Sequence, residues 1–69
     1  MSSDSSEAAV RLAAYDAFAR DVRDELARTS ERMEQLRLQG KVKSAAYRQL
    51  FAMRSTLRDI ERRLAEHGL

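Results

Sequence analysis

Three arginines at four-residue spacing are the side chains in this sequence best placed to do chemistry together. Arg54, Arg58 and Arg62 fall on one ridge of an α-helix, because residues four apart lie on the same helical face. Tyr47 and Phe51 precede them on the same side, and we call these five residues the basic ridge. Like charges at this spacing repel by about 0.2–0.5 kcal/mol per pair, so the ridge would gain from an acidic partner.

Three kinds of surroundings fit the basic ridge. A nucleic acid could place its phosphates on the arginines and stack its bases on Tyr47 and Phe51. Carboxylates from the first helix of a partner subunit could face the arginines instead, and solvent alone also suffices because arginine is a good helix former. Lys41 and Lys43, just before the second helix, could contact phosphate, although lysines there also stabilise the negative end of the first helix.

The overall charge disfavours nucleic acid as the main partner. The chain carries 13 Lys and Arg against 11 Asp and Glu, a net charge of +2, whereas nucleic-acid-binding domains show a stronger basic excess. Acidic residues outnumber basic ones up to Gly40, and basic ones outnumber acidic ones from Lys41 onward. The second helix is therefore the electropositive half, and the search for a partner begins there.

The sequence contains no recognisable catalytic or metal-binding constellation. There is no cysteine, the only histidine is His67, and no Glu-x-x-His pair occurs. A structural zinc site needs four such ligands, and a nucleophilic site needs a nucleophile beside a base. We therefore expect no catalytic residues, no metal, no cofactor and no enzymatic activity.

Two stripes of mostly apolar residues predict the helices that carry these side chains. In each stripe the spacing alternates between three and four residues, which keeps one edge of an α-helix toward a partner helix. The first stripe is Leu12, Tyr15, Ala19, Val22, Leu26, Thr29, Met33 and Leu36, and the second is Ala46, Leu50, Met53, Leu57, Ile60, Leu64 and His67. The pattern predicts two helices joined by a short turn.

Caps and breakers set the expected boundaries. A flexible N-terminus over residues 1–4 is expected to precede a single helical-hairpin domain over residues 5–69. Within the domain we predict a helix over about 5–39, a turn over 40–43 and a helix over about 44–67. Gly40 and Gly68 can adopt the left-handed conformation that closes a helix, and Ser44 is a suitable N-cap.

Folding the chain at this turn into an antiparallel hairpin predicts which residues meet. Equal rise in both helices places Thr29 opposite Met53 and Val22 opposite Ile60. The flanking pairs expected in this register are Arg23 with Glu61, Arg37 with Tyr47, Arg63 with Phe18, and His67 with Tyr15.

The first predicted helix is longer than the second, which leaves roughly its first ten residues without a partner helix. This overhang is rich in alanine and also holds Val10 and Leu12. A 69-residue hairpin without disulfides normally needs a second chain to bury enough apolar surface. We expect an all-α fold, a coiled-coil-like antiparallel two-helix hairpin that dimerises into a homodimeric four-helix bundle.

These features favour a non-enzymatic protein–protein interaction or assembly module that acts through the exposed face of the second helix. Its expected partners are a second copy and an unidentified protein. The alternative is a small nucleic-acid-binding regulator that uses the basic ridge with Lys41 and Lys43. An acidic N-terminus, with no apolar run near the ~20 residues that span a bilayer, predicts a cytoplasmic protein without membrane contact.

Overall fold

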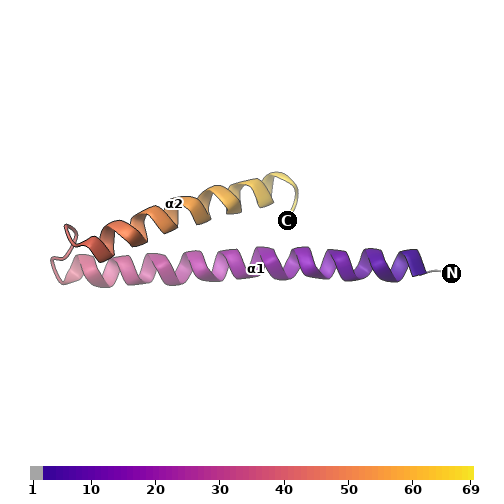
Figure 1. Cartoon of the computed structure of the whole chain (residues 1–69), viewed down its shortest axis with the longest axis horizontal. Coiled ribbons are helices and arrows are strands. Elements are labelled where there is room, and N and C mark those ends of the chain that lie inside the picture. Colours follow the sequence, from indigo (N-terminus) through magenta and orange to yellow (C-terminus); the bar gives the residue numbers. More distant parts are fainter. Residues whose placement is uncertain (1–2) are drawn as a thin grey trace.

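The two stripe-bearing segments form two antiparallel α-helices, as predicted (Figure 1). The structure is a computed structural model that describes residues 3–69, with side chains from residue 6 onward. Helix α1 spans Ser3–Leu38 and helix α2 spans Ala45–Glu66. The molecule measures 60 × 17 × 15 Å. A helix with its side chains is about 10–12 Å across, so the two helices side by side fill the two short dimensions. Neither described helix combines the length and apolarity needed to span a membrane.

The helix boundaries differ slightly from those predicted. Ser3 and Asp4 belong to α1, although residues 1–4 are predicted to be flexible, and residues 1 and 2 lie outside the described part of the chain. Acidic residues in a first turn stabilise the positive end of a helix, which favours an early start. The connection between the helices covers residues 39–44, one residue more at each end than the predicted turn.

Gly40 closes α1, as predicted, by adopting a positive φ of 73°. Its N–H donates to the carbonyl of Arg37 at 3.0 Å, and the next N–H, of Lys41, donates to the carbonyl of Leu36 at 2.8 Å. This pair of bonds is the Schellman motif, which satisfies carbonyl groups that the last turn of a helix would leave free. The chain can therefore reverse direction immediately after α1.

A second Schellman motif at the end of α2 turns the chain back onto α1. Gly68 has a φ of 80°, and the N–H of Leu69 donates to the carbonyl of Leu64 at 2.8 Å. Leu69 then packs against the core, and the Nη2 group of Arg23 donates to its backbone oxygen at 2.5 Å. Figure 1 shows the C-terminus returning toward α1. This cap ties the end of α2 to the middle of α1.

Ser44 is the N-cap of α2, as predicted. Its backbone is extended, with φ −74° and ψ 156°, and its Oγ accepts from the N–H of Tyr47 at 3.1 Å. The same hydroxyl donates to the carbonyl of Lys41 at 2.7 Å, which links the cap to the turn. An N-cap of this kind contributes about 0.5–2 kcal/mol, so Ser44 helps to set where α2 begins.

Contacts between the helices confirm the predicted register. The Thr29 hydroxyl donates to the Met53 sulfur at 3.7 Å, and Arg23 Nε donates to Glu61 Oε2 at 3.3 Å. The core around this register consists of Ala19, Val22, Leu57 and Leu64, with Leu26, Ile60 and Leu69 packed against it. Met33 and Thr29, at 2% and 5% exposure, continue it toward the turn.

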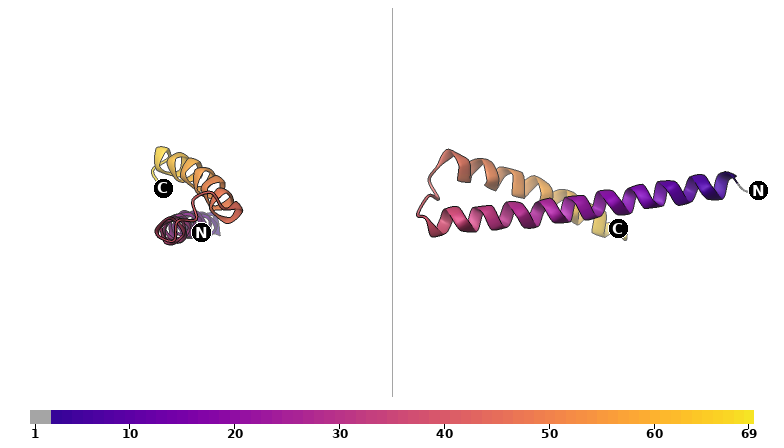
Figure 2. Two further views of the ribbon diagram at one scale, coloured as in Figure 1. Left: turned by 90° about the vertical axis from the view of Figure 1, so that its left-hand side faces the viewer. Right: turned by 90° about the horizontal axis from the view of Figure 1, so that it is seen from below.

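The two helices cross each other and separate toward the end of α2. Figure 2 shows the crossing from two directions, and Figure 1 shows the ribbons diverging away from the turn. Met53, a stripe residue expected to fill the core, remains 45% exposed. Among the described residues no large side chain is completely buried. The hairpin therefore holds a thin core, and α1 continues past the end of α2 without cover.

Candidate functional site

The basic ridge lies along α2 with its aromatic and cationic groups interleaved. Phe51 is 52% exposed, Arg58 and Arg62 are exposed, and Tyr47 and Arg54 are half-buried. The guanidinium carbon of Arg54 lies 5.4 Å from the centroid of the Phe51 ring, which is a cation–π contact. Arginine and aromatic side chains combined in this way are typical of interaction surfaces.

The three ridge arginines do not share one environment. Arg62 forms an ion pair with Asp59, one turn earlier on the same helix, and Arg63 Nε lies 4.0 Å from the other oxygen of that carboxylate. Arg54 is engaged by Phe51, whereas Arg58 has no ion-pair partner among the described residues. The acidic group expected to face the ridge is thus supplied in part by α2 itself.

Lys41 and Lys43 lie in the connection between the helices, with both residues exposed. Their backbone carbonyls accept local hydrogen bonds, from Ser44 to Lys41 and from Arg48 to Lys43. Lys43 precedes α2, and Arg54, the ridge arginine nearest to it, comes eleven residues later, about 16 Å at about 1.5 Å per residue. The structure therefore does not bring the two candidate phosphate-binding lysines together with the arginines.

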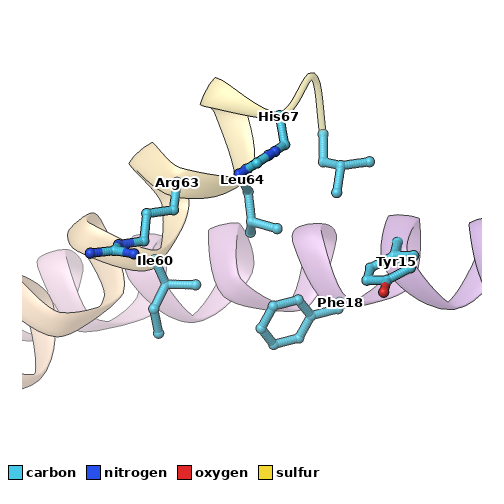
Figure 3. A pocket seen from close by; sticks show the side chains of 7 residues that line it. Tyr15, Phe18, Ile60, Arg63, Leu64 and His67 are labelled. Atoms are coloured by element: carbon cyan, nitrogen blue, oxygen red, sulfur yellow. The ribbon is translucent and has the colours of Figure 1, made fainter.

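A second candidate surface is an apolar groove where the helices separate, shown in Figure 3. Its volume is about 450 Å³, and we call it the open-end groove. Tyr15 and Phe18 of α1 and Ile60, Arg63, Leu64 and His67 of α2 line it, and Leu69 closes one side. Ile60 and Leu64 point from α2 toward α1, where the rings of Phe18 and Tyr15 lie (Figure 3). The groove joins residues from both helices.

The open-end groove continues onto the uncovered part of α1. An adjoining hollow of about 460 Å³ is lined by Arg11, Ala14, Tyr15 and Phe18, so the two depressions share both aromatic residues. Tyr15 and Phe18 are 56% and 49% exposed. The predicted pairs Arg63 with Phe18 and His67 with Tyr15 line this groove from opposite helices, and the sequence does not reveal that a groove opens between them. The unequal helix lengths are the signal that could have indicated it.

At the turn end of the hairpin, Arg37 is engaged by Glu34 beside Tyr47. Arg37 donates to the two carboxylate oxygens at 2.9 and 2.5 Å. This hydrogen bonding lowers the pKa of Glu34, and the same pair raises the pKa of Arg37, to which Tyr47 adds a smaller electrostatic contribution. Among the described residues Arg37 makes no cation–π contact with Tyr47, and its guanidinium is engaged by Glu34 instead.

The lowered pKa of Glu34 predicts a pH dependence. Because the pKa is lower in the folded than in the unfolded chain, the pair stabilises the fold above the unfolded pKa, and this contribution is lost as the pH falls through the folded pKa. Glu34→Gln should therefore lose less thermal stability on acidification than the wild type, measured by circular dichroism. Glu31→Gln, which removes another exposed glutamate of α1 and leaves the Glu34–Arg37 pair in place, is the matched control. Identical acid profiles for all three chains would contradict a role for this pair.

No group of three or more His, Cys, Asp or Glu side chains within the described part of the chain is arranged to hold a metal ion. Comparison of the chain with protein-family models, with curated proteins and with solved structures finds no match.

Proposed function

We propose that this chain is a non-enzymatic protein–protein interaction or assembly module that works as a homodimer and binds a partner through the basic ridge. The observation that carries this function is that Phe51 and Arg58 are exposed on α2, with the half-buried Arg54 between them in contact with the Phe51 ring. Residues of these types account for most of the binding energy at protein interfaces when a partner removes them from water.

Self-association is supported by what the single hairpin leaves uncovered. Of the side chains from residue 6 onward, eight large apolar ones are substantially exposed: Val10, Leu12, Tyr15, Phe18, Leu38, Val42, Phe51 and Met53. A chain of this size buries a small fraction of its surface, and a second copy supplies more core. A dimer in which four helices come together at this end, with each overhang reaching the other subunit, would cover the four of these side chains at the start of α1, Val10, Leu12, Tyr15 and Phe18.

A protein partner suits the basic ridge better than a nucleic acid because the ridge charge is already partly compensated. Asp59 neutralises Arg62, Phe51 holds Arg54, and the two turn lysines lie too far away to extend the row. A phosphate backbone needs several free cations in succession. An acidic and apolar protein surface needs one free arginine beside an exposed aromatic ring, and Arg58 and Phe51 meet that requirement.

A double substitution tests the ridge. Phe51→Ser with Arg58→Ser should abolish capture of the partner by the immobilised full-length chain from a lysate of its source, because both exposed contact groups are lost. The matched control is Leu38→Ser with Arg32→Ser, which removes one exposed leucine and one exposed arginine from α1. Circular dichroism should show unchanged helicity in both. Equal capture by wild type and ridge variant would exclude this surface.

The same chains test the nucleic-acid alternative, for which the exposed turn lysines and Arg58 are the candidate phosphate contacts. Under that alternative, a fluorescent single-stranded RNA would bind the wild type and dissociate steeply between about 50 and 200 mM salt. We expect no anisotropy change at low salt. Nuclease treatment of the lysate should likewise leave partner capture unchanged.

A further inference from the structure

We propose that the first part of α1 from a second copy of this chain lies in the open-end groove, so that two chains exchange these segments reciprocally. We call residues 6–15 the α1 arm. This contact rests on the self-association proposed above and names the surface that performs it. Its ligand is the same segment that borders the groove in each copy.

The α1 arm has no partner within its own hairpin. Every residue of the arm is exposed, with Val10 at 69% and Leu12 at 58%. In Figure 1 it extends past the end of α2. A helix of fewer than about 12–15 residues is only marginally stable in water, so this segment gains stability from a surface that covers it. Its alanines would let another helix approach closely.

The open-end groove is shaped for an elongated occupant. It runs from Ile60 and Leu64 across Phe18 and Tyr15 to Ala14, because the two hollows that form it share both aromatic residues. A compact ligand would fill one hollow and leave the other filled with solvent. A helix that lies along α1 covers both, and it covers the arm that carries the second hollow.

A second copy meets this requirement with two-fold symmetry. In an antiparallel pair of α1 helices centred on Ala14, equal rise places Val10 of each copy level with Phe18 of the other. Each chain then supplies one arm and one groove, and the assembly closes at two chains because the contact is self-complementary. Ala14, which lines the second hollow, lies next to its own counterpart at the symmetry axis.

Arg63 supplies a positive charge at the level where the arm of the other copy begins. The same alignment brings Glu7 of the arm level with the turn of α2 that carries Arg63. The Arg63 side chain is 74% exposed, and its ion pair with Asp59 is long, at 4.0 Å. His67 lies at the same rim of the groove. The same alignment places Glu7 level with Asp21 of the other α1, and Arg63 lies at that level to offset the repulsion between the two carboxylates.

The charges along the middle of α1 confine the contact to this end. Arg20, Asp21, Asp24, Glu25, Arg28, Glu31 and Arg32 are all exposed there. A fully side-by-side bundle would remove several of these groups from water, and buried charges without good partners are costly. Pairing through the arms covers the apolar end and leaves the charged middle hydrated.

This arrangement leaves the basic ridge available. Arg54 of the ridge and Arg63 of the groove are nine residues apart, which is two and a half turns at 3.6 residues per turn, so they face opposite sides of α2. One side of the hairpin binds a second copy, and the other presents the ridge to a different partner.

The arm contact is tested by measuring the molecular mass in solution of the wild type and of two matched α1 variants. The wild type should measure as two chains by light scattering from low micromolar to near-millimolar concentration. Val10→Asp should weaken the dimer at least about tenfold, because it charges a side chain that enters the groove. Leu38→Asp makes the same kind of change at a residue of equal exposure, 73% against 69%, at the far end of α1, and should remain dimeric.

Cross-linking separates loss of the contact from fraying of the arm. The chain contains no cysteine, so Ala14→Cys introduces a single thiol beside the proposed axis with little effect on the helix. Under mild oxidation, Ala14→Cys should form a covalent dimer at least about tenfold faster than Leu38→Cys, since proximity raises the effective concentration of the second thiol.

Two results would overturn the arm contact in different ways. A wild type that measures as one chain throughout the concentration range removes both this contact and the self-association proposed above. A dimer that tolerates Val10→Asp, with no faster cross-linking at residue 14 than at residue 38, leaves self-association standing and excludes the arm and the open-end groove as its surface.

Discussion

Leu57→Ala is expected to destabilise the hairpin by about 2–4 kcal/mol, because it removes a buried leucine and leaves a cavity that two helices cannot refill. Leu57 is 8% exposed and lies in the cluster with Ala19, Val22 and Leu64. A chain of 69 residues has a total stability of about 3–10 kcal/mol. The variant should thus lose a large share of its stability, and its thermal midpoint should fall by roughly 4–8 °C per kcal/mol.

The matched control for this change is Leu38→Ala. Leu38 belongs to α1 and is 73% exposed, so the same truncation there should change stability by no more than about 0.5 kcal/mol. Both variants should be melted by circular dichroism at one low protein concentration, so that association contributes equally. Equal midpoints for Leu57→Ala and the wild type would mean that the α1–α2 cluster does not hold the hairpin together.

Gly40→Val is expected to cost about 1–2 kcal/mol through the backbone alone. Gly40 has a φ of 73°, a conformation that a β-branched residue rarely adopts. A Cβ added at this position meets no other atom within 4 Å, so crowding adds nothing to the cost. The strain would act on the bond from Lys41 N–H to the Leu36 carbonyl, which closes α1. Urea denaturation should show the loss as a lower midpoint with an unchanged slope.

Asparagine provides the comparison for Gly40. It adopts the left-handed conformation more readily than valine does, so Gly40→Asn should recover most of the stability that Gly40→Val loses. If both variants lose the same amount, the cost comes from something other than backbone conformation.

The sequence predicts the local features of this fold well because each depends on neighbours along the chain. The three-four spacing gives both helices, and Gly40, Ser44 and Gly68 occupy the cap positions assigned to them. The register also follows, since two helices of equal rise joined by a short turn have few alternatives. The contacts from Thr29 to Met53 and from Arg23 to Glu61 lie where this geometry places them.

The separation of the helices could not be predicted in the same way. How closely two helices pack depends on the sizes of facing side chains in three dimensions, and a spacing pattern treats Met53 and Leu57 as equivalent. Met53 is nevertheless 45% exposed, whereas Leu57 is 8% exposed. The open-end groove lies beyond Leu57, between Ile60 and Leu64 of α2 and Phe18 and Tyr15 of α1, and the sequence pattern contains only an indirect sign of it in the unequal helix lengths.

The basic ridge shows a different reason for an incomplete prediction. The four-residue spacing of Arg54, Arg58 and Arg62 suggests three equivalent cations, but residues three apart are also neighbours on a helix. Phe51 stands three residues before Arg54, and Asp59 stands three before Arg62, so both arginines have local partners. Glu61 likewise stands three residues after Arg58, but it pairs with Arg23 of α1, so it is the structure that leaves Arg58 without an ion pair among the described residues.

The bond from Arg23 to the backbone oxygen of Leu69 marks a division within α1. From about residue 19 onward, α1 packs against α2 and melts only when the hairpin core melts. Before that point no described side chain of α1 is buried, so within a single chain this segment can unwind while the rest stays intact. α1 is therefore one continuous helix whose two parts, before and after about residue 19, unfold separately. Contact with a second copy would make the two parts unfold together.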